Sequence, residues 1–101
     1  MEGNASVATD VLARYAADAA SEVDGVAGLV EGRLPRQGAV RVSQDDGRVS
    51  LELHLKLAWD AAAHDVCAEV QRRVADYLGL MAGARPLAVD VVVDDVETQA
   101  R

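Results

Sequence analysis

The sequence has few of the residue types from which small functional sites are usually built. Cysteine occurs once, at Cys67, so the chain can form neither an internal disulfide nor a metal site made of several cysteines. Phenylalanine is absent, and the 101 residues include only 1 Trp and 2 Tyr. Proteins that bind single-stranded nucleic acid usually stack bases on such rings. The shortage argues against that class of function, and Cys67, within an apolar helical stripe, is expected to be an inert core thiol.

Positive charge is also scarce. The chain carries 10 Lys and Arg against 17 Asp and Glu, which gives a formal net charge of −7. Phosphate backbones and anionic lipid headgroups are bound mainly by clustered Lys and Arg. The balance therefore disfavours direct binding to nucleic acid, and we expect the charge to serve solubility first.

Long hydrophobic runs are missing as well. No apolar stretch approaches the ~20 residues that a membrane-spanning helix needs, and the first residues lack the basic and apolar regions of a signal peptide. We therefore expect a cytoplasmic protein that does not insert into a membrane by itself. With 50% apolar residues and only 2 Pro, we expect one folded domain over 1–101, its core over about 6–96 and its ends, 1–5 and 97–101, frayed.

The sequence does contain clear helix and strand patterns of apolar residues, one after another. Apolar residues at every fourth position predict a helix over 6–23, with Ser6 or Thr9 as its cap. Gly32, Pro35 and Gly38 then predict a loop. The helix is expected to bury a stripe, flanked by Leu12 and Ala16, that consists of Val7, Val11, Tyr15, Ala19 and Val23.

A hairpin and a second helix follow. Strict alternation predicts a strand over 49–57, paired through the turn at 45–47 with a strand around Val40 and Val42. A helix is expected from about Ala61 to Met81, capped by Asp60 and closed by Gly83, and a last strand over 87–93. The stripe of that helix comprises Val66, Cys67, Val70, Val74, Tyr77, Leu78 and Met81.

These elements predict the fold class. Each helix has one apolar stripe, and the hairpin has one apolar face. A two-layer α/β (α+β) sandwich satisfies both, in the order helix, hairpin strands, helix, strand. Both helices then lie on one face of a small mixed sheet.

Candidate catalytic groups are few. His54 lies on the polar face of its strand, and His64 lies in the first turn of the second helix. Neither stands in a G-x-S-x-G or H-E-x-x-H context, so both are expected to be surface histidines. We predict no catalytic residue and no cofactor; a small enzyme using His64 and nearby acids stays as a third hypothesis.

Metal binding is not predicted either. His64 and Asp65 diverge by about 100° on a helix, so with Asp60 they make a poor shared site. The carboxylates at 90, 94 and 95 lie in no calcium-loop pattern. A solvated acidic strand end is the expected arrangement there.

The segment 22–28 ends the first helix and contains a G-x-x-G at Gly25 and Gly28. KH domains hold an RNA backbone with such a loop, so a KH-like RNA-binding module stays open as the alternative function. Those loops carry basic residues, whereas Val26 and Ala27 stand here in acidic surroundings. We favour Gly25 as a left-handed helix cap and Gly28 as room for a tight turn.

Two places are candidates for protein contacts. The polar face of the hairpin has mixed charge and exposed edges, which suit pairing with another copy or a partner. The loop before it is the most basic part of the chain. The predicted interaction surface is Arg33, Arg36, Arg41, Glu52, His54 and Lys56.

The order and spacing of several short motifs cover about 7–96. They are the segment 22–28, then 49–53, then Val70-Gln71 with Val74, then 81–83 and 89–93. With them the chain resembles the alkaline shock, or Gls, family of bacterial envelope stress response proteins. It departs from the usual family residues at Asp24, Trp59, Asp60, Ala82 and Asp90.

The resemblance implies a non-enzymatic cytoplasmic protein that serves cell-envelope homeostasis. It also implies the kind of partner. Relatives of this kind self-assemble, and some lie at the membrane through a separate, small membrane-anchored protein. The resemblance therefore implies a homo-oligomer, with possible membrane association through a partner.

Overall fold

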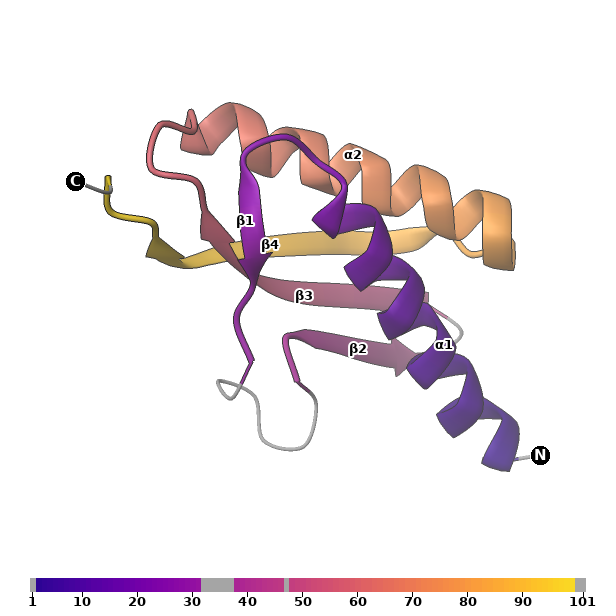
Figure 1. Ribbon diagram of the computed structural model, residues 1–101. Coiled ribbons are helices and arrows are strands. Elements are labelled where there is room, and N and C mark those ends of the chain that lie inside the picture. The colour runs from indigo at the N-terminus through magenta and orange to yellow at the C-terminus, as the bar shows by residue number, and fades with distance from the viewer. Residues whose placement is uncertain (1, 32–37, 47, 100–101) are drawn as a thin grey trace.

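Two helices lie against one face of a sheet in the computed structural model, which describes residues 2–31, 38–46 and 48–99, with side chains from residue 9 onward (Figure 1). The elements are α1 (Glu2–Ser21), β1 (Val26–Leu29), β2 (Val40–Asp45), β3 (Arg48–Leu57), α2 (Ala63–Ala82) and β4 (Pro86–Val96). The predicted two-layer α/β architecture is confirmed.

Strand β3 is the centre of the sheet. β4 runs parallel to it along one side, from the pair Val49–Pro86 to the pair Leu57–Val96. β2 pairs antiparallel with the first part of the other side, and β1 pairs antiparallel with its last residues. The sheet is therefore mixed, as predicted, and β3 supports all three of the other strands.

The core lies between the helices and β3. Odd-numbered residues of β3 point to the helices and are almost fully buried, with Leu53 and Leu55 at 0% exposure. From α2 the buried residues are those at 66, 70, 74 and 78, which confirms the main part of its predicted stripe. Met81, also placed in that stripe, is 46% exposed, because it lies in the last turn, beyond the covering sheet.

The buried stripe of α1 is shifted by one residue from the predicted one. Leu12, Ala16 and Ala20 are buried against the sheet, whereas Val11 is 39% exposed. Small side chains at 16 and 20 let the helix lie close to α2 and β2. Tyr15 is half-buried and meets Tyr77 of α2 edge to face, with ring centroids 5.7 Å apart.

Several element boundaries also differ from those predicted. α1 begins at Glu2, within the stretch expected to fray, and ends at Ser21. A short strand, β1, occupies 26–29, directly after the turn at Gly25. α2 begins after Ala62, which has an extended backbone and makes no side-chain cap, so Asp60 is not the cap. Gly83 does close α2, in the left-handed conformation.

Gly25 joins α1 to β1 at a point where a side chain does not fit. Its φ is 97°, and a Cβ there would lie 2.6 Å from Cγ2 of Val66. The predicted left-handed glycine is confirmed, and its backbone is enclosed by α2 and the segment before it. Gly28 has open space around it and no positive φ, so the tight-turn role predicted for it is wrong.

Candidate interaction surface

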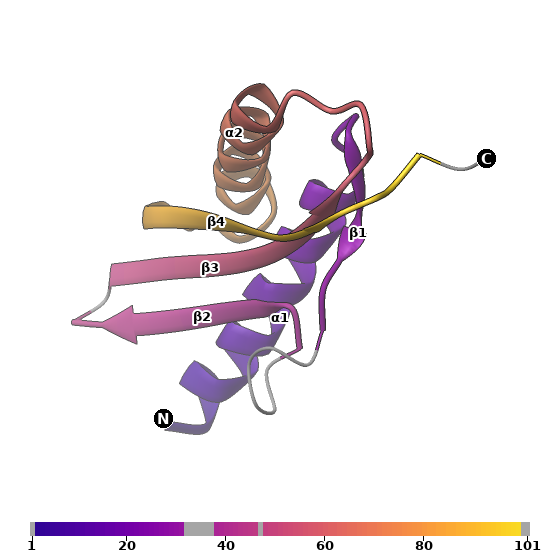
Figure 2. The same ribbon diagram turned by 90° about the vertical axis from the view of Figure 1, so that its left-hand side faces the viewer.

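The face of the sheet opposite the helices is open. In Figure 2, β2 and β3 pass in front of α1, and α2 lies above β4. Even-numbered residues of β3 lie on it because side chains alternate along a strand. The register adds neighbours from both sides: Arg41 is opposite Glu52, and Ser43 is opposite Ser50. Asp95 of β4 is opposite Lys56.

Four of the six predicted contact residues, Arg41, Glu52, His54 and Lys56, lie on this outer face. Arg41 lies 3.9 Å from Glu52, measured from Nη1 to Oε1, with 51% of the Arg41 side chain exposed. Lys56 is half-buried on the same face. Arg33 and Arg36, the basic loop residues predicted to add to the surface, lie outside the described residues.

His54 belongs to the outer face but is not a surface residue. It is 8% exposed, so the expected surface histidine is wrong. Its Nδ1 lies 2.6 Å from Oδ2 of Asp94, and its Nε2 lies 2.7 Å from Oε2 of Glu52. Its backbone N–H donates to the carbonyl of Ala39 at 3.0 Å. Central position explains the burial, since β4 and the segment leading into β2 flank the ring on both sides.

This arrangement favours the protonated ring. An ionised carboxylate only accepts hydrogen bonds, so only the imidazolium form can donate to both carboxylates at once. Burial lowers the pKa of His54, but the hydrogen bonds to Glu52 and Asp94 and their negative charges outweigh it, and the pKa is raised from 6.5. Asp94 therefore binds His54, which contradicts the solvated strand end expected for this carboxylate.

Held in this way, His54 has no ring nitrogen available to act as a base. The other titratable candidates are no better placed for catalysis. His64 is exposed at the start of α2. Burial raises the pKa of the Cys67 thiol, which lowers its reactive thiolate fraction. Within the described ranges, no three His, Cys, Asp or Glu residues are grouped so as to hold a metal ion.

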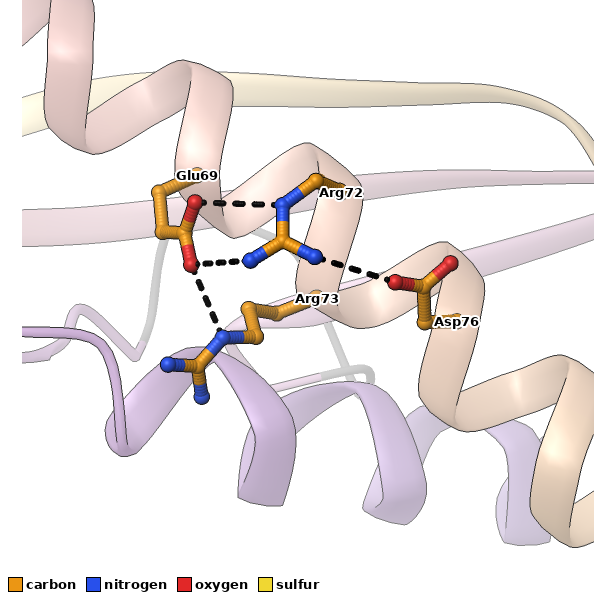
Figure 3. A network of polar contacts seen from close by, with 4 residues as sticks. All are labelled: Glu69, Arg72, Arg73 and Asp76. Carbon is orange, nitrogen blue, oxygen red and sulfur yellow. Dashed lines mark hydrogen bonds and ion pairs between the residues drawn. The ribbon is translucent and has the colours of Figure 1, made fainter.

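The solvated side of α2 carries a network of ion pairs (Figure 3). Nε of Arg73 lies 2.8 Å from Oε2 of Glu69, one helical turn earlier. Arg72 bridges Glu69 at 2.6 Å and Asp76 at 3.2 Å. The hydrogen bonds from Arg72 and Arg73 lower the pKa of Glu69. These four side chains are engaged with one another.

An open acidic cleft of about 330 Å³ lies beside this network, where α1 ends against α2. Its charged lining residues are Glu22, Asp24, Asp65, Glu69 and Arg73. Arg73 also lines a smaller neighbouring cleft of about 130 Å³ with Asp18 and Tyr77. The cleft contains only one basic side chain, so it is unsuited to phosphate groups. As for membranes, none of the helices in the described part of the chain is long and apolar enough to cross one.

Comparison with known proteins gives a family and a fold. The model of the alkaline shock protein 23 family, cell envelope-related function, matches residues 1–98. No curated protein sequence matches the chain. Among solved structures, a MamM variant has a TM-score of 0.64 and 18% identity, covering 91% of this chain and 89% of that one. A MamM CTD in a nickel form has a TM-score of 0.64 and 19% identity, covering 87% and 99%. At such identities the likeness shows the fold alone.

Proposed function

This chain belongs to the alkaline shock protein family of cell envelope-related function, and on that premise we propose that it is a non-enzymatic interaction module acting in cell-envelope homeostasis. It acts in the cytoplasm by binding other copies of itself and a small membrane-anchored protein. Through that partner it reaches the membrane, although it has no membrane segment among its described helices.

The outer face of the sheet is the observation that carries this proposal. A two-layer fold usually covers the apolar side of its sheet and leaves the other side to solvent or to a partner. Here the uncovered side presents Arg41, Glu52 and Lys56 around a buried imidazolium, and Leu87 adds an apolar side chain that is 64% exposed. Charges of both signs with some apolar area are typical of surfaces that bind proteins reversibly.

The absence of enzymatic activity is part of the proposal. Both ring nitrogens of His54 are engaged by carboxylates, and the pKa of Cys67 is raised by burial. General acid–base or nucleophilic catalysis needs a side chain that reaches a substrate with a proton or a lone pair to exchange. The buried His54 ring and the half-buried Cys67 thiol do not meet that requirement.

The test is chemical crosslinking in the native cell, followed by mass spectrometry. We expect crosslinks from the outer face to other copies and to one small membrane-anchored protein. The double variant Arg41→Ala, Lys56→Ala should lose them. The matched control, Arg14→Ala with Arg85→Ala, removes two exposed charges elsewhere and should keep them. A chain that forms no crosslinks, or whose crosslinks survive the first variant and vanish in the second, contradicts the proposal.

A further inference from the structure

β4 is the longest strand of the sheet and lies at its edge. It runs over Pro86–Val96, and among the described strands only β3 pairs with it. We call its other side, which has no strand partner within the described ranges, the free side of β4. A strand edge presents main-chain N–H and C=O groups that can pair with an added strand. Extended segments of partner proteins bind folded domains in this way.

One main-chain group of β4 already accepts a hydrogen bond from outside the sheet. The side-chain amide of Gln71 on α2 donates to the carbonyl of Val89 at 2.8 Å. Main-chain groups of a strand point alternately to its two sides, so Val91 and Val93, in the same phase as Val89, are expected to direct theirs away from β3 as well. A donor that approaches the free side of β4 therefore meets acceptors there.

The apolar side chains of β4 are incompletely covered. Val89, Val91 and Val93 pack against the core on the helix side but are only half-buried, whereas Leu53 and Leu55 of β3 are 0% exposed. The difference arises because β3 has a strand on each side and β4 has one on a single side. An added strand would cover these three valines with its own apolar side chains, and removing that area from water favours binding.

α2 leaves room for such side chains near the start of β4. Ala75 and Gly79, one helical turn apart, face an open cleft of about 430 Å³, which the segment 84–86 lines from the other side. Neither residue has a side chain larger than a methyl group. A strand that adds beside the start of β4 therefore does not have to displace a large side chain from these two positions.

The free side of β4 is acidic. The strand contains three Asp and no Lys or Arg. Asp94 contacts His54, whereas Asp90 and Asp95 are exposed, and so is Glu97 just after the strand. Pairing β4 with β4 of a second copy would bring the same carboxylates close together, so charge disfavours a second copy at this edge. It favours a segment that carries Lys or Arg.

We propose that the free side of β4 binds an extended, basic segment of the membrane-anchored partner as an additional strand. Its Lys or Arg side chains lie beside Asp90 and Asp95, and the apolar side chains between them cover the half-buried valines. The inference rests on the proposed function, which includes that partner, and adds the binding site and the chemistry of the bound segment. Cytoplasmic segments close to a membrane-spanning helix carry an excess of Lys and Arg, which matches an acidic edge.

The position of this site agrees with an interaction through the outer face. Side chains alternate along an added strand, so every second one lies on the same side of the sheet as Asp90 and Asp95. An added strand therefore widens the outer face, and one partner can contact both the free side of β4 and the residues around Arg41.

A synthetic peptide tests the site. The probe is a short, fluorescently labelled peptide in which Lys and Val alternate, and its binding is measured by fluorescence anisotropy. We expect it to bind, and in nitrogen-15 NMR spectra the amides of Val91 and Val93 should shift and become protected from hydrogen exchange.

Two N-methylated peptides distinguish strand addition from attraction between charges. One carries N-methyl groups on every Lys and the other on every Val, so both keep the charge of the probe. In an added strand only one of these two sets of N–H groups points to β4. One peptide should therefore bind at least about tenfold more weakly, and the other should bind as well as the probe.

A charge variant tests the acidic edge. Asp90→Asn with Asp95→Asn should weaken binding of the probe by about fivefold, because two exposed charges are lost beside the added strand. Asp10→Asn with Asp18→Asn changes the net charge equally on α1 and should leave the affinity nearly unchanged. Circular dichroism checks that both variants are folded. Equal weakening in both would mean that overall charge attracts the peptide, which overturns the proposed site.

The other outcomes separate the site from the proposed function. Failure of the probe to bind at about millimolar concentration, or equal binding of both N-methylated peptides, overturns strand addition at β4. Crosslinks in the native cell between this chain and a small membrane-anchored protein would then still support the proposed function. If such a protein is found but its crosslinks avoid β4 and the adjacent side of α2, the site is wrong and the function stands. If no such protein is found, the proposed partner itself is wrong.

Discussion

His54 shows how a residue on the solvent side of a sheet becomes part of the folded structure. Its ring is held between Glu52 and Asp94 on the central strand, and it is nine-tenths buried. Because its pKa is raised on folding, the folded state binds a proton more tightly than the unfolded state. The resulting stability is fully present below the unfolded pKa of about 6.5 and is lost as the pH rises through the folded pKa.

We therefore expect the free energy of unfolding to fall as the pH rises from about 6 through the folded pKa of His54. The loss is about 1.4 kcal/mol for each unit by which the folded pKa exceeds the unfolded one. Urea unfolding at a series of pH values measures it. His54→Gln should flatten the dependence in this range, and His64→Gln, at an exposed position, should not. A flat curve for the wild type would rule out this account of His54.

Part of the rise in the pKa of His54 should come from Asp94. Asp94→Asn keeps the shape of the side chain but removes the negative charge next to Nδ1, so the pKa of His54 should fall. NMR titration of the two histidine ring protons measures this directly, with His64 as the internal reference. Asp95→Asn, one residue further along, serves as the control and should change the His54 pKa much less. Equal shifts in both variants would mean that the carboxylate contact is not specific.

Gly25 and Gly28 are a matched pair for testing backbone strain. Gly25→Ala places a Cβ at a φ of 97° and within 2.6 Å of Val66, so it should cost about 2 kcal/mol of stability. Gly28→Ala meets nothing within 4 Å, and its effect should stay within about 0.5 kcal/mol. Urea unfolding of the two variants compares them, and a similar loss in both would contradict the structural role of Gly25.

At the scale of elements, two substitutions in α1 can show which of its two adjacent apolar stripes is buried. Ala16 is 0% exposed, so Ala16→Leu should overpack the core beneath α1 and cost about 1–3 kcal/mol. Val11 is 39% exposed, and Val11→Ala should cost less than about 1 kcal/mol. Thermal unfolding ranks the two. The opposite ranking would mean that α1 is rotated toward the stripe expected from sequence.

Sequence patterns predicted the elements well where the pattern was local and long. The five alternating apolar residues of 49–57 determined β3, and the spacing of Val66, Val70 and Val74 determined the buried side of α2. α1 has apolar residues on two adjacent stripes. Which stripe is buried depends on the surface that the helix packs against, and the local sequence does not specify that surface. β1 is four residues long and contains Gly28, too short for an alternation to stand out.

At the scale of the whole molecule, the layers were predictable and the contacts between distant strands were not. Arg41, Glu52 and Lys56 were placed on one face from alternation alone. The contact of His54 with Asp94 joins residues 40 positions apart and depends on the register of a parallel pair. Parallel strands are joined through a crossover, so no turn fixes their register in the sequence. The position of Asp95 opposite Lys56 depends on that same register.

The buried residues form a single cluster that includes both helices and the sheet. We expect urea unfolding to be one cooperative transition, because no part of the described chain has a separate core. Far-ultraviolet circular dichroism reports the helices, and the near-ultraviolet signal reports the Tyr15–Tyr77 contact. The two curves should coincide; separate midpoints would show that α1 and α2 come apart before the sheet unfolds.

The parallel pairing of β3 with β4 has a consequence for synthesis on the ribosome. β3 precedes α2 and β4 in the chain, so a nascent chain that has emerged only through α2 can already cover the helix side of the sheet. It still has one side of β3 open and His54 without Asp94. The outer face is therefore completed last, when β4 leaves the exit tunnel, and an unfinished chain cannot present the whole of that face to a partner.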